Sequence, residues 1–178
     1  EGAEAEVAAT VAAIQPIFAR HGAIERRTAR DEHERKQLWA GRKGAFGAMG
    51  RVAPDLYVAD VVVPRTRLRE MVLRSTEIAR ARRLRLATVF HAGDGNLHPN
   101  ICYDRRDADE VRRVLEAGDE IMRLCVEYGG SLTGEHGVGL EKQAHMEQLL
   151  TPPDPAALWP VPEALDTAQR PNPGPLHP

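Results

Sequence analysis

The chain has 178 residues, with 24 Lys+Arg against 26 Asp+Glu and 42% hydrophobic residues, which suits one globular domain and argues against wholesale disorder. No apolar run approaches the roughly 18 residues of a membrane-spanning helix, and the acidic start lacks the basic region of a secretory signal. The two cysteines, Cys102 and Cys125, form no CxxC pair. This excludes a disulfide framework and a cysteine-rich zinc site, and favours a reducing compartment.

The first part of the chain is predicted to alternate helices with short strands. Apolar residues at helical spacing predict a helix over residues 4–20 with one buried face, which Pro16 interrupts near its end. A short strand over residues 23–28 and a helix from 31 or 32 to about 46 follow. Residues 56–63 are rich in β-branched side chains and predict a strand that Pro64 ends.

Residues 65–85 are dense in arginine, with only Glu70 and Glu77 opposing the positive charge. The simplest interpretation is the solvated face of a helix; a docking face for another domain or for anionic lipid is the alternative. Nucleic acid is not an expected partner, because the net charge is −2 and no aromatic residue interleaves with these arginines.

The second part of the chain predicts strands over 86–90 and 100–103 around a glycine-rich turn. A long amphipathic helix over 111–126 and a short strand over 131–133 follow. Strands separated by helices, with one hairpin, predict an α+β fold: a ferredoxin-like antiparallel sheet with helices packed on one face. Most of the 13 prolines lie after residue 150, so the predicted domain is 1–150, followed by a Pro-rich strap over 151–178.

The densest polar segment is 91–98 (HAGDGNLH), between two predicted strands. If Asp94 and Gly95 form a two-residue turn, His91 stands opposite His98 and both imidazoles can reach one metal ion. The alternative, which spacing alone leaves open, is two unrelated histidines beside a good turn. An ordinary catalytic metal site has three protein ligands, so a third must come from elsewhere.

The obvious donor is the segment 134–139 (GEHGVG), whose glycines let the backbone approach another group closely. Glu135 and His136 can supply one metal ligand and one general base. The alternative is a plain strand-to-helix turn with a solvated Glu and His. Zinc, manganese and iron all suit such ligands, which do not choose between them.

The segment 39–43 (WAGRK) is a weaker signal. A helical Trp with a cation three residues later is usually a packing anchor beside a solvent-facing charge. The functional interpretation is that Arg42 binds a carboxylate through two guanidinium nitrogens, for which its planar group is better suited than the Lys43 ammonium.

Four segments together resemble the C-terminal domain of the FAD-linked oxidases, and nearly the whole chain is covered in the expected order. The family includes the glycolate oxidase flavin subunit, D-lactate dehydrogenase and D-2-hydroxyglutarate dehydrogenase. The segments are 39–46 (WAGRKGAF), 55–64 (DLYVADVVVP), 91–101 (HAGDGNLHPNI) and 129–142 (GGSLTGEHGVGLEK). In the tail, Asn172 begins a segment similar to the family's terminal LNPGK.

The resemblance implies a role for each matching residue. His91, His98 and Glu135 are expected to bind a divalent metal, and His136 to take the proton from the α-hydroxyl of a small 2-hydroxy acid. The resemblance also implies that Arg42 binds the substrate carboxylate, that Asn100 lies near the substrate and that Asn172 contacts the flavin. The expected reaction is oxidation of glycolate or D-lactate to the 2-oxo acid, with hydride transfer to FAD.

The resemblance also implies partners and a location. FAD is held mostly by a flavin-binding domain, in cis or in trans, and other oxidase subunits are expected. The expected location is cytoplasmic and at most peripheral to the inner membrane.

Three departures from the family pattern set further expectations. Val58 stands where relatives that act on D-2-hydroxyglutarate carry a Lys, so a long diacid substrate is disfavoured. In the tail, Pro171 and Pro175 stand in place of the expected Leu and Lys. No flavin-binding domain is present and the sheet is expected to lack its first strand, so a non-catalytic metal-binding fragment is the alternative. A metal-dependent hydrolase with Glu135 as base fits the ligands and nothing else in the chain.

Overall fold

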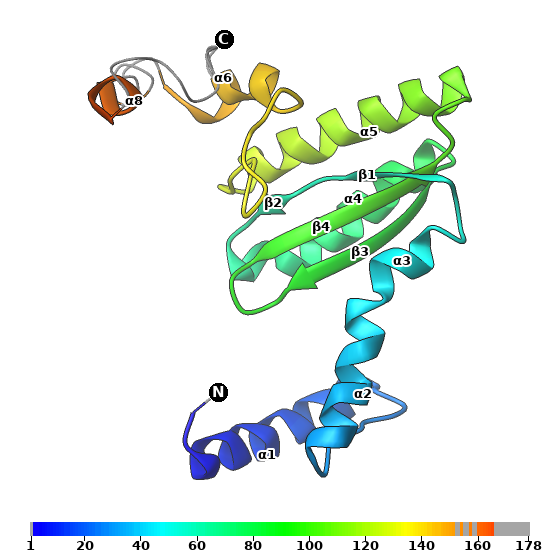
Figure 1. Ribbon diagram of the computed structural model, residues 1–178, viewed down its shortest axis with the longest axis vertical. Coiled ribbons are helices and arrows are strands. Elements are labelled where there is room, and N and C mark those ends of the chain that lie inside the picture. The colour runs from blue at the N-terminus through cyan, green and yellow to red at the C-terminus, as the bar shows by residue number, and fades with distance from the viewer. Residues whose placement is uncertain (1, 152–153, 155–156, 158–159, 166–178) are drawn as a thin grey trace. The chain divides into compact units, whose positions relative to one another are not determined.

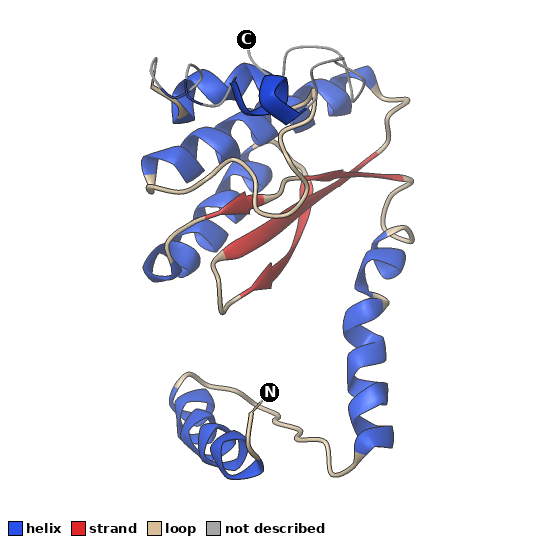
Figure 2. Ribbon diagram, turned by 60° about the vertical axis from the view of Figure 1, so that its left-hand side comes forward, coloured by secondary structure: helices blue, strands red, loops and turns tan. Residues whose placement is uncertain are grey.

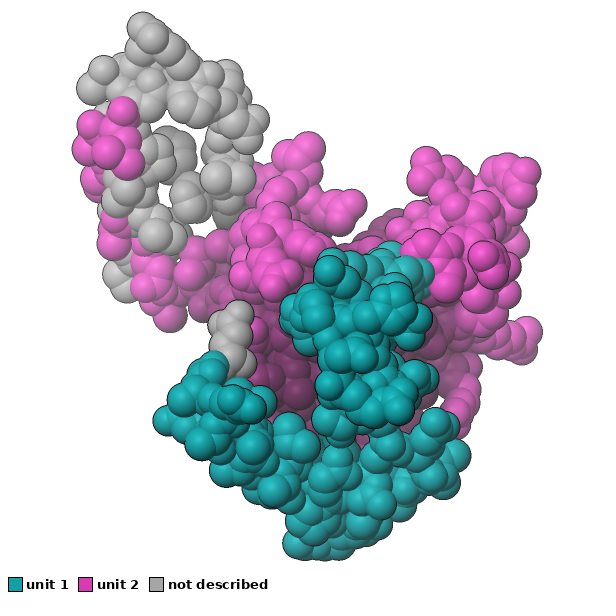
Figure 3. Space-filling model, turned by 60° about the horizontal axis from the view of Figure 1, so that its bottom comes forward, with its two compact units in different colours: residues 1–46 teal, residues 47–178 magenta. Residues whose placement is uncertain are grey.

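The computed structural model describes every residue except 1, 152–153, 155–156, 158–159 and 166–178. The chain divides into two compact units, Glu1–Phe46 and Gly47–Pro178, which Figure 3 colours separately. The boundary at residue 150 and the strap over 151–178 stay predictions, because most of residues 151–178 lie outside the described part. Asn172 lies there too.

In the first unit, a buried carboxylate fixes the start of a helix. The helices are α1 (Glu4–Arg20), α2 (Glu32–Lys43) and the beginning of α3 (Ala45–Met49). Asp31 caps α2 by accepting a hydrogen bond from the backbone of Glu34 at 2.8 Å. Hydrogen bonds from the backbone and side chain of Arg30 and from the side chain of Arg27 lower the pKa of Glu34 to about 2. Glu34 therefore stays ionised and ties the preceding segment to α2.

Two predictions for the first unit are wrong. Residues 23–28 form no strand, and no residue of α1 is buried, since Ile14 and Phe18 are 37% and 49% exposed. The apolar side of α1 instead lines an open hollow of about 450 Å³ beside residues 23–28. Helical spacing identifies an amphipathic helix, but does not say whether its own unit covers it. The helix continues through Pro16 to Arg20.

The second unit is built on an antiparallel sheet whose central strand is β4 (Figure 1). One edge of β4 pairs with β3, and the other edge pairs with both β1 and β2. No described strand pairs with the outer edge of β3, and the missing first strand stays a prediction. The elements are β1 (Asp55–Val58), β2 (Val61–Val62), η1 (Arg65–Arg67), α4 (Leu68–Ala81), β3 (Arg85–His91), β4 (Asn96–Tyr103), α5 (Ala108–Glu127), η2 (Gln143–His145), α6 (Met146–Leu149) and α8 (Pro160–Leu165).

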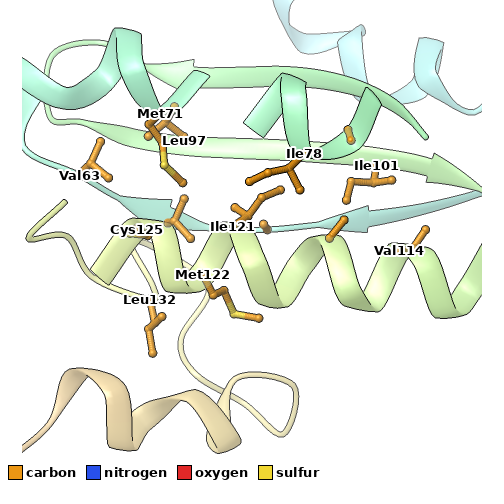
Figure 4. Packing of buried hydrophobic residues seen from close by; sticks show 14 of the residues in the cluster. Val63, Met71, Ile78, Leu97, Ile101, Val114, Ile121, Met122, Cys125 and Leu132 are labelled. Carbon is orange, nitrogen blue, oxygen red and sulfur yellow. The ribbon is translucent and has the colours of Figure 1, made fainter. Parts of the chain in front are cut away.

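Helices α4 and α5 pack on the same side of the sheet (Figure 2), which confirms the predicted α+β fold with helices on one face. Alternate residues of β4, Leu97 and Ile101, point into this core and are fully buried. Figure 4 shows Ile78 of α4 and Ile121 of α5 among them. The other residues of β4 consequently face away from the helices, and this second face carries the polar segment.

The arginine-rich segment forms η1 and the predicted helix, α4, and ends at the first residue of β3. Its arginines lie on the outer face, where Arg67 and Arg74 pair with Glu70 and Glu77 at 2.8 and 2.5 Å. Such exposed pairs contribute little to stability. Across the described residues, no helix is both long and apolar enough to cross a membrane.

The strand predicted over residues 56–63 is divided into β1 and β2 by a proline on the neighbouring strand. The Ala59 backbone N–H donates to the Pro99 carbonyl at 3.0 Å, but proline has no N–H to return the bond. The pairing register is the same on both sides of this gap. Asp60, within the gap, therefore stands opposite His98 of β4.

Candidate metal and substrate site

The hairpin between β3 and β4 has a longer loop than the sequence predicts. His91 pairs with Asn96, and His98 pairs with Val89, so the predicted two-residue turn with His91 opposite His98 is wrong. The His91 carbonyl accepts hydrogen bonds from the backbones of Asp94 and Gly95, which closes a four-residue loop. The Asp94 side chain accepts from the Asn96 backbone at 3.0 Å and fixes the end of the loop.

The two histidines nevertheless share one face of the sheet. The observed register differs from the predicted one by two residues, and side chains alternate with a period of two. His91 and His98 are thus diagonal neighbours, which long side chains can bridge. Their ring centroids lie 5.6 Å apart at an interplanar angle of 87°.

Two glycines bring the segment after α5 against this face. The backbones of Ser131 and Val62 exchange hydrogen bonds at 2.8 and 3.0 Å, an isolated bridge in place of the predicted strand over 131–133. A Cβ atom on Gly130 would lie 2.2 Å from the Val62 carbonyl oxygen, and one on Gly134 would lie 2.8 Å from the Asn96 side chain. Only glycine permits this approach. The expectation from the segment 134–139 is thus confirmed for Gly134, whereas the Cβ positions of Gly137 and Gly139 have no such neighbour among the described residues.

The segment 133–136 is tied to the sheet by one buried carboxylate oxygen. Oδ2 of Asp60 accepts hydrogen bonds from the Thr133 hydroxyl at 3.0 Å and from three successive backbone N–H groups, those of Gly134, Glu135 and His136, at 2.9, 3.0 and 2.9 Å. A run of backbone N–H groups turned to one side forms an anion-binding concavity. Here that concavity is filled from within the protein.

The three predicted metal ligands lie together at the end of the sheet. Donor atoms of His91, His98 and Glu135 all lie within 4.8 Å of one another. The two Glu135 carboxylate oxygens are 3.8 Å from His91 Nε2 and 3.7 Å from His98 Nε2. His98 is buried whereas His91 and Glu135 are exposed, so the group is anchored on one side and open to solvent on the other.

The predicted base and one predicted substrate residue adjoin this group. The ring of His136 stacks on that of His98, with centroids 5.3 Å apart and an interplanar angle of 13°. Asn100, two residues along β4 from His98, is fully buried. Its amide nitrogen donates to the carbonyls of His98 and Ala87 at 2.7 and 3.1 Å. Its Oδ1 accepts from no described residue.

Burial and hydrogen bonding set the charges at the site. Burial alone would raise the pKa of Asp60, but the backbone bonds from residues 134–136 and the Thr133 hydroxyl outweigh it and hold that pKa well below its usual range. Burial lowers the pKa of His98, against the opposing attraction of Asp60. The site therefore pairs an ionised carboxylate with a neutral imidazole, the form in which histidine binds metals.

One known protein family matches nearly the whole chain. The family model described as FAD linked oxidases, C-terminal domain, matches residues 1–176. The chain belongs to this family.

Curated relatives of this oxidase domain are glycolate oxidase and D-lactate dehydrogenase proteins. It is 40% identical over 174 residues to glycolate oxidase subunit GlcD of Escherichia coli strain K12, covering 98% of this chain and 35% of the relative. The chain is 37% identical to GlcD of Bacillus subtilis, in a match that covers 90% of this chain and 34% of the relative. The chain is 30% identical to the mitochondrial D-lactate dehydrogenase [cytochrome] of Arabidopsis thaliana, in a match that covers 99% of this chain and 32% of the relative. The oxidase domain thus spans about a third of the length of these relatives.

Two further positions singled out by the family resemblance, Arg42 and Val58, are not among the three predicted metal ligands. Arg42 lies on α2 in the first unit and is half-buried, so its role as carboxylate ligand stays a prediction. Val58 is at the end of β1, paired with Asn100. An apolar side chain therefore lies beside Asn100, and the expectation that a long diacid is disfavoured stays a prediction.

Two buried charged residues of the oxidase domain have no predicted role from the sequence. Asp60 is fully buried, and the Lys142 amine donates to the Asp60 carbonyl at 2.7 Å. That carbonyl points outward from the sheet, where the Lys142 amine satisfies it. The sequence does contain one sign that Asp60 has a role, because it is a single carboxylate among apolar residues of a predicted strand. A carboxylate in such a strand is buried only if other groups pair with it.

Proposed function

We propose that the oxidase domain binds a divalent metal ion and a small 2-hydroxy acid, and forms the substrate-binding part of an FAD-dependent dehydrogenase. The reaction is oxidation of glycolate or D-lactate to the 2-oxo acid. The observation that carries the proposal is the convergence of His91, His98 and Glu135, with His136 stacked beside them. The chain covers a third of its relatives' length, so the activity of a longer protein is part of the proposal.

The donor set fits a divalent ion. Two imidazoles and one carboxylate are ligands of zinc, manganese and iron, and three protein ligands leave further positions for a substrate. His91, His98 and Glu135 would hold the ion. A bound metal would supply Lewis acidity, which favours loss of the α-hydroxyl proton of a hydroxy acid.

The oxidase domain's own residues would then handle substrate and proton. His136 is exposed and adjoins the ligand group, so its imidazole can accept the proton of the α-hydroxyl. Asn100 would lie beside the substrate, and Arg42 would bind the substrate carboxylate through its planar guanidinium. Bound FAD supplies the hydride acceptor, held mostly by a flavin-binding domain in cis or in trans.

The relatives support this choice of substrate class. These relatives are named as a glycolate oxidase subunit and a D-lactate dehydrogenase. The two acids differ by one methyl group, which is worth only ~1–3 kcal/mol in a pocket. The proposed surroundings are the cytoplasm, with any membrane association peripheral and with other oxidase subunits as partners.

The test is turnover in a protein that joins this oxidase domain to a flavin-binding domain. Reduction of an artificial electron acceptor by glycolate or D-lactate, with 2-hydroxyglutarate as the disfavoured comparison, is the expected result. Metal binding without turnover of any 2-hydroxy acid would instead support a non-catalytic metal-binding fragment.

The metal site has its own test in the chain alone. Replacing His98 with alanine removes one of the three proposed ligands. Loss of a hydrogen-bond partner of a ligand typically lowers metal affinity about 10–100-fold, so loss of the ligand itself should lower zinc affinity by more than this. Competition with a chelator measures it. His33→Ala, on the exposed side of α2, is the control and should bind zinc as the unaltered chain does. Equal affinity in His98→Ala would remove the hairpin from the proposed site.

A further inference from the structure

Asp60 contacts the proposed metal site with both carboxylate oxygens, in two different ways. Oδ2 has a full set of donors, namely one hydroxyl and three backbone N–H groups of residues 133–136. Oδ1 is buried and accepts from no described residue. Oδ2 therefore holds the segment that contains Glu135 and His136, whereas Oδ1 can accept a hydrogen bond from another group.

The group that Oδ1 faces is the buried nitrogen of His98. His98 Nδ1 lies 3.7 Å from Asp60 Oδ1 and, like it, is buried without a hydrogen-bond partner among the described residues. Two unpartnered polar atoms at this depth are costly apart, whereas a small movement would make them donor and acceptor. An ionised carboxylate can only accept, so the hydrogen must be on Nδ1.

The other nitrogen of His98 faces the proposed ligands. Nε2 lies 3.7 Å from Glu135 Oε2, on the side where His91 also contributes a donor. A neutral imidazole carries one hydrogen, so placing it on Nδ1 leaves the Nε2 lone pair for a metal ion. Carboxylates that orient metal-binding histidines in this way fix both the ring and its tautomer.

We infer that Asp60 is the positioning residue of this site: Oδ1 holds His98 as the tautomer with hydrogen on Nδ1, and Oδ2 holds the segment that carries Glu135 and His136. The position of His98 and the position of the segment with Glu135 and His136 thus both depend on one buried carboxylate. The metal-binding consequence rests on the proposed function, whereas the tautomer of His98 does not.

A second donor set competes with this assignment. Asp60, His98 and His136 also have donor atoms within 4.8 Å of one another. The His98 nitrogen that faces Asp60 is Nδ1, 3.7 Å from Oδ1. That set is the less accessible one, because Asp60 and His98 are both buried. It also needs Asp60 Oδ1 as a ligand instead of an acceptor, so the tautomer of His98 separates the two.

The first experiment measures the imidazole ¹⁵N shifts of His98 in the unaltered, metal-free chain. The expected result is hydrogen on Nδ1, with a directly bonded proton seen at that nitrogen. Hydrogen on Nε2 would overturn the inference. This measurement needs no variant and no metal, so it gives an answer even where the proposed metal site or a variant's folding fails.

The second experiment uses Asp60→Asn with zinc alone as the probe. The asparagine oxygen can replace Oδ2 as acceptor, which leaves the NH₂ group facing His98 Nδ1. Nδ1 must then accept and Nε2 must carry the hydrogen, so zinc affinity should fall about 10–100-fold and the His98 tautomer should change. Unaltered tautomer and affinity in a folded Asp60→Asn chain would overturn the inference.

Asp119→Asn is the matched control. Asp119 also faces a histidine, with Oδ1 3.0 Å from His145 Nε2, but on α5 and outside the proposed site. It should leave zinc affinity unchanged. Zinc binding that is insensitive to His98→Ala would defeat the proposed metal site and leave the tautomer of His98 to decide the role of Asp60.

Discussion

Replacing His136 with glutamine should lower the rate of flavin reduction by a 2-hydroxy acid about 10²–10⁴-fold, the range that a general base contributes. Glutamine keeps a hydrogen-bonding group of similar size but cannot accept the α-hydroxyl proton. His136 stacks on His98 and is not one of the three proposed ligands. Zinc content should therefore stay the same. Rapid mixing of substrate with the oxidase domain joined to a flavin-binding domain measures the rate.

The separation of rate from metal content is what makes this substitution informative. His33→Gln, the same chemical change on the exposed side of α2, is the control and should leave both quantities unchanged. Full activity in His136→Gln would assign the base to another group. Loss of both activity and zinc would mean that His136 contributes to the metal site itself, as the group of Asp60, His98 and His136 allows.

The hairpin illustrates how a wrong register can preserve a correct site. The sequence predicts that His91 opposes His98, but the Asp94 side chain and the Gly95 backbone close a four-residue loop instead. The error is two residues, and side chains repeat on a face every two residues. Residue alternation is thus a stronger constraint than the turn type, and the shared face of the two histidines follows from it.

Asp60 shows where reasoning from motifs is limited. Its neighbours are apolar and its own strand signal is strong, so the sequence gives no partner for it. Its partners are backbone N–H groups more than 70 residues away. Backbone donors carry no residue identity, and sequence patterns therefore cannot reveal them. Only the fold brings the glycine-containing segment over the carboxylate.

The first helix shows a different limit. Its apolar spacing correctly predicts a helix, but the expected buried face is exposed in its own unit, with Phe18 49% accessible. Periodicity reports which residues share a face and not what covers that face. In α4 and α5 the same spacing correctly predicts a buried face, because the sheet that covers this face belongs to the same unit.

Replacing Gly95 with alanine should destabilise the second unit by about 3 kcal/mol or more. Gly95 has a φ of +88°, a conformation that costs other residues ~1–2 kcal/mol. A Cβ atom there would lie 2.1 Å from the Val63 carbonyl oxygen, and such overpacking typically costs ~1–3 kcal/mol more. The backbone of Val63 also donates to the Gly95 carbonyl at 3.1 Å. The hairpin should therefore separate from β2, and zinc affinity should fall with it.

Gly93→Ala is the matched control, because it makes the same change two residues earlier in the same loop. Among the described residues, apart from Gly93 and its two chain neighbours, no atom lies within 4 Å of the Cβ position at Gly93, and its φ is not in the left-handed region. Its free energy of unfolding should change by no more than ~0.5 kcal/mol. Denaturant unfolding followed by circular dichroism measures both variants. If the two alanines cost the same, the contact between Gly95 and Val63 does not hold the hairpin. The positions of His91 and His98 would then depend on the β3–β4 ladder alone.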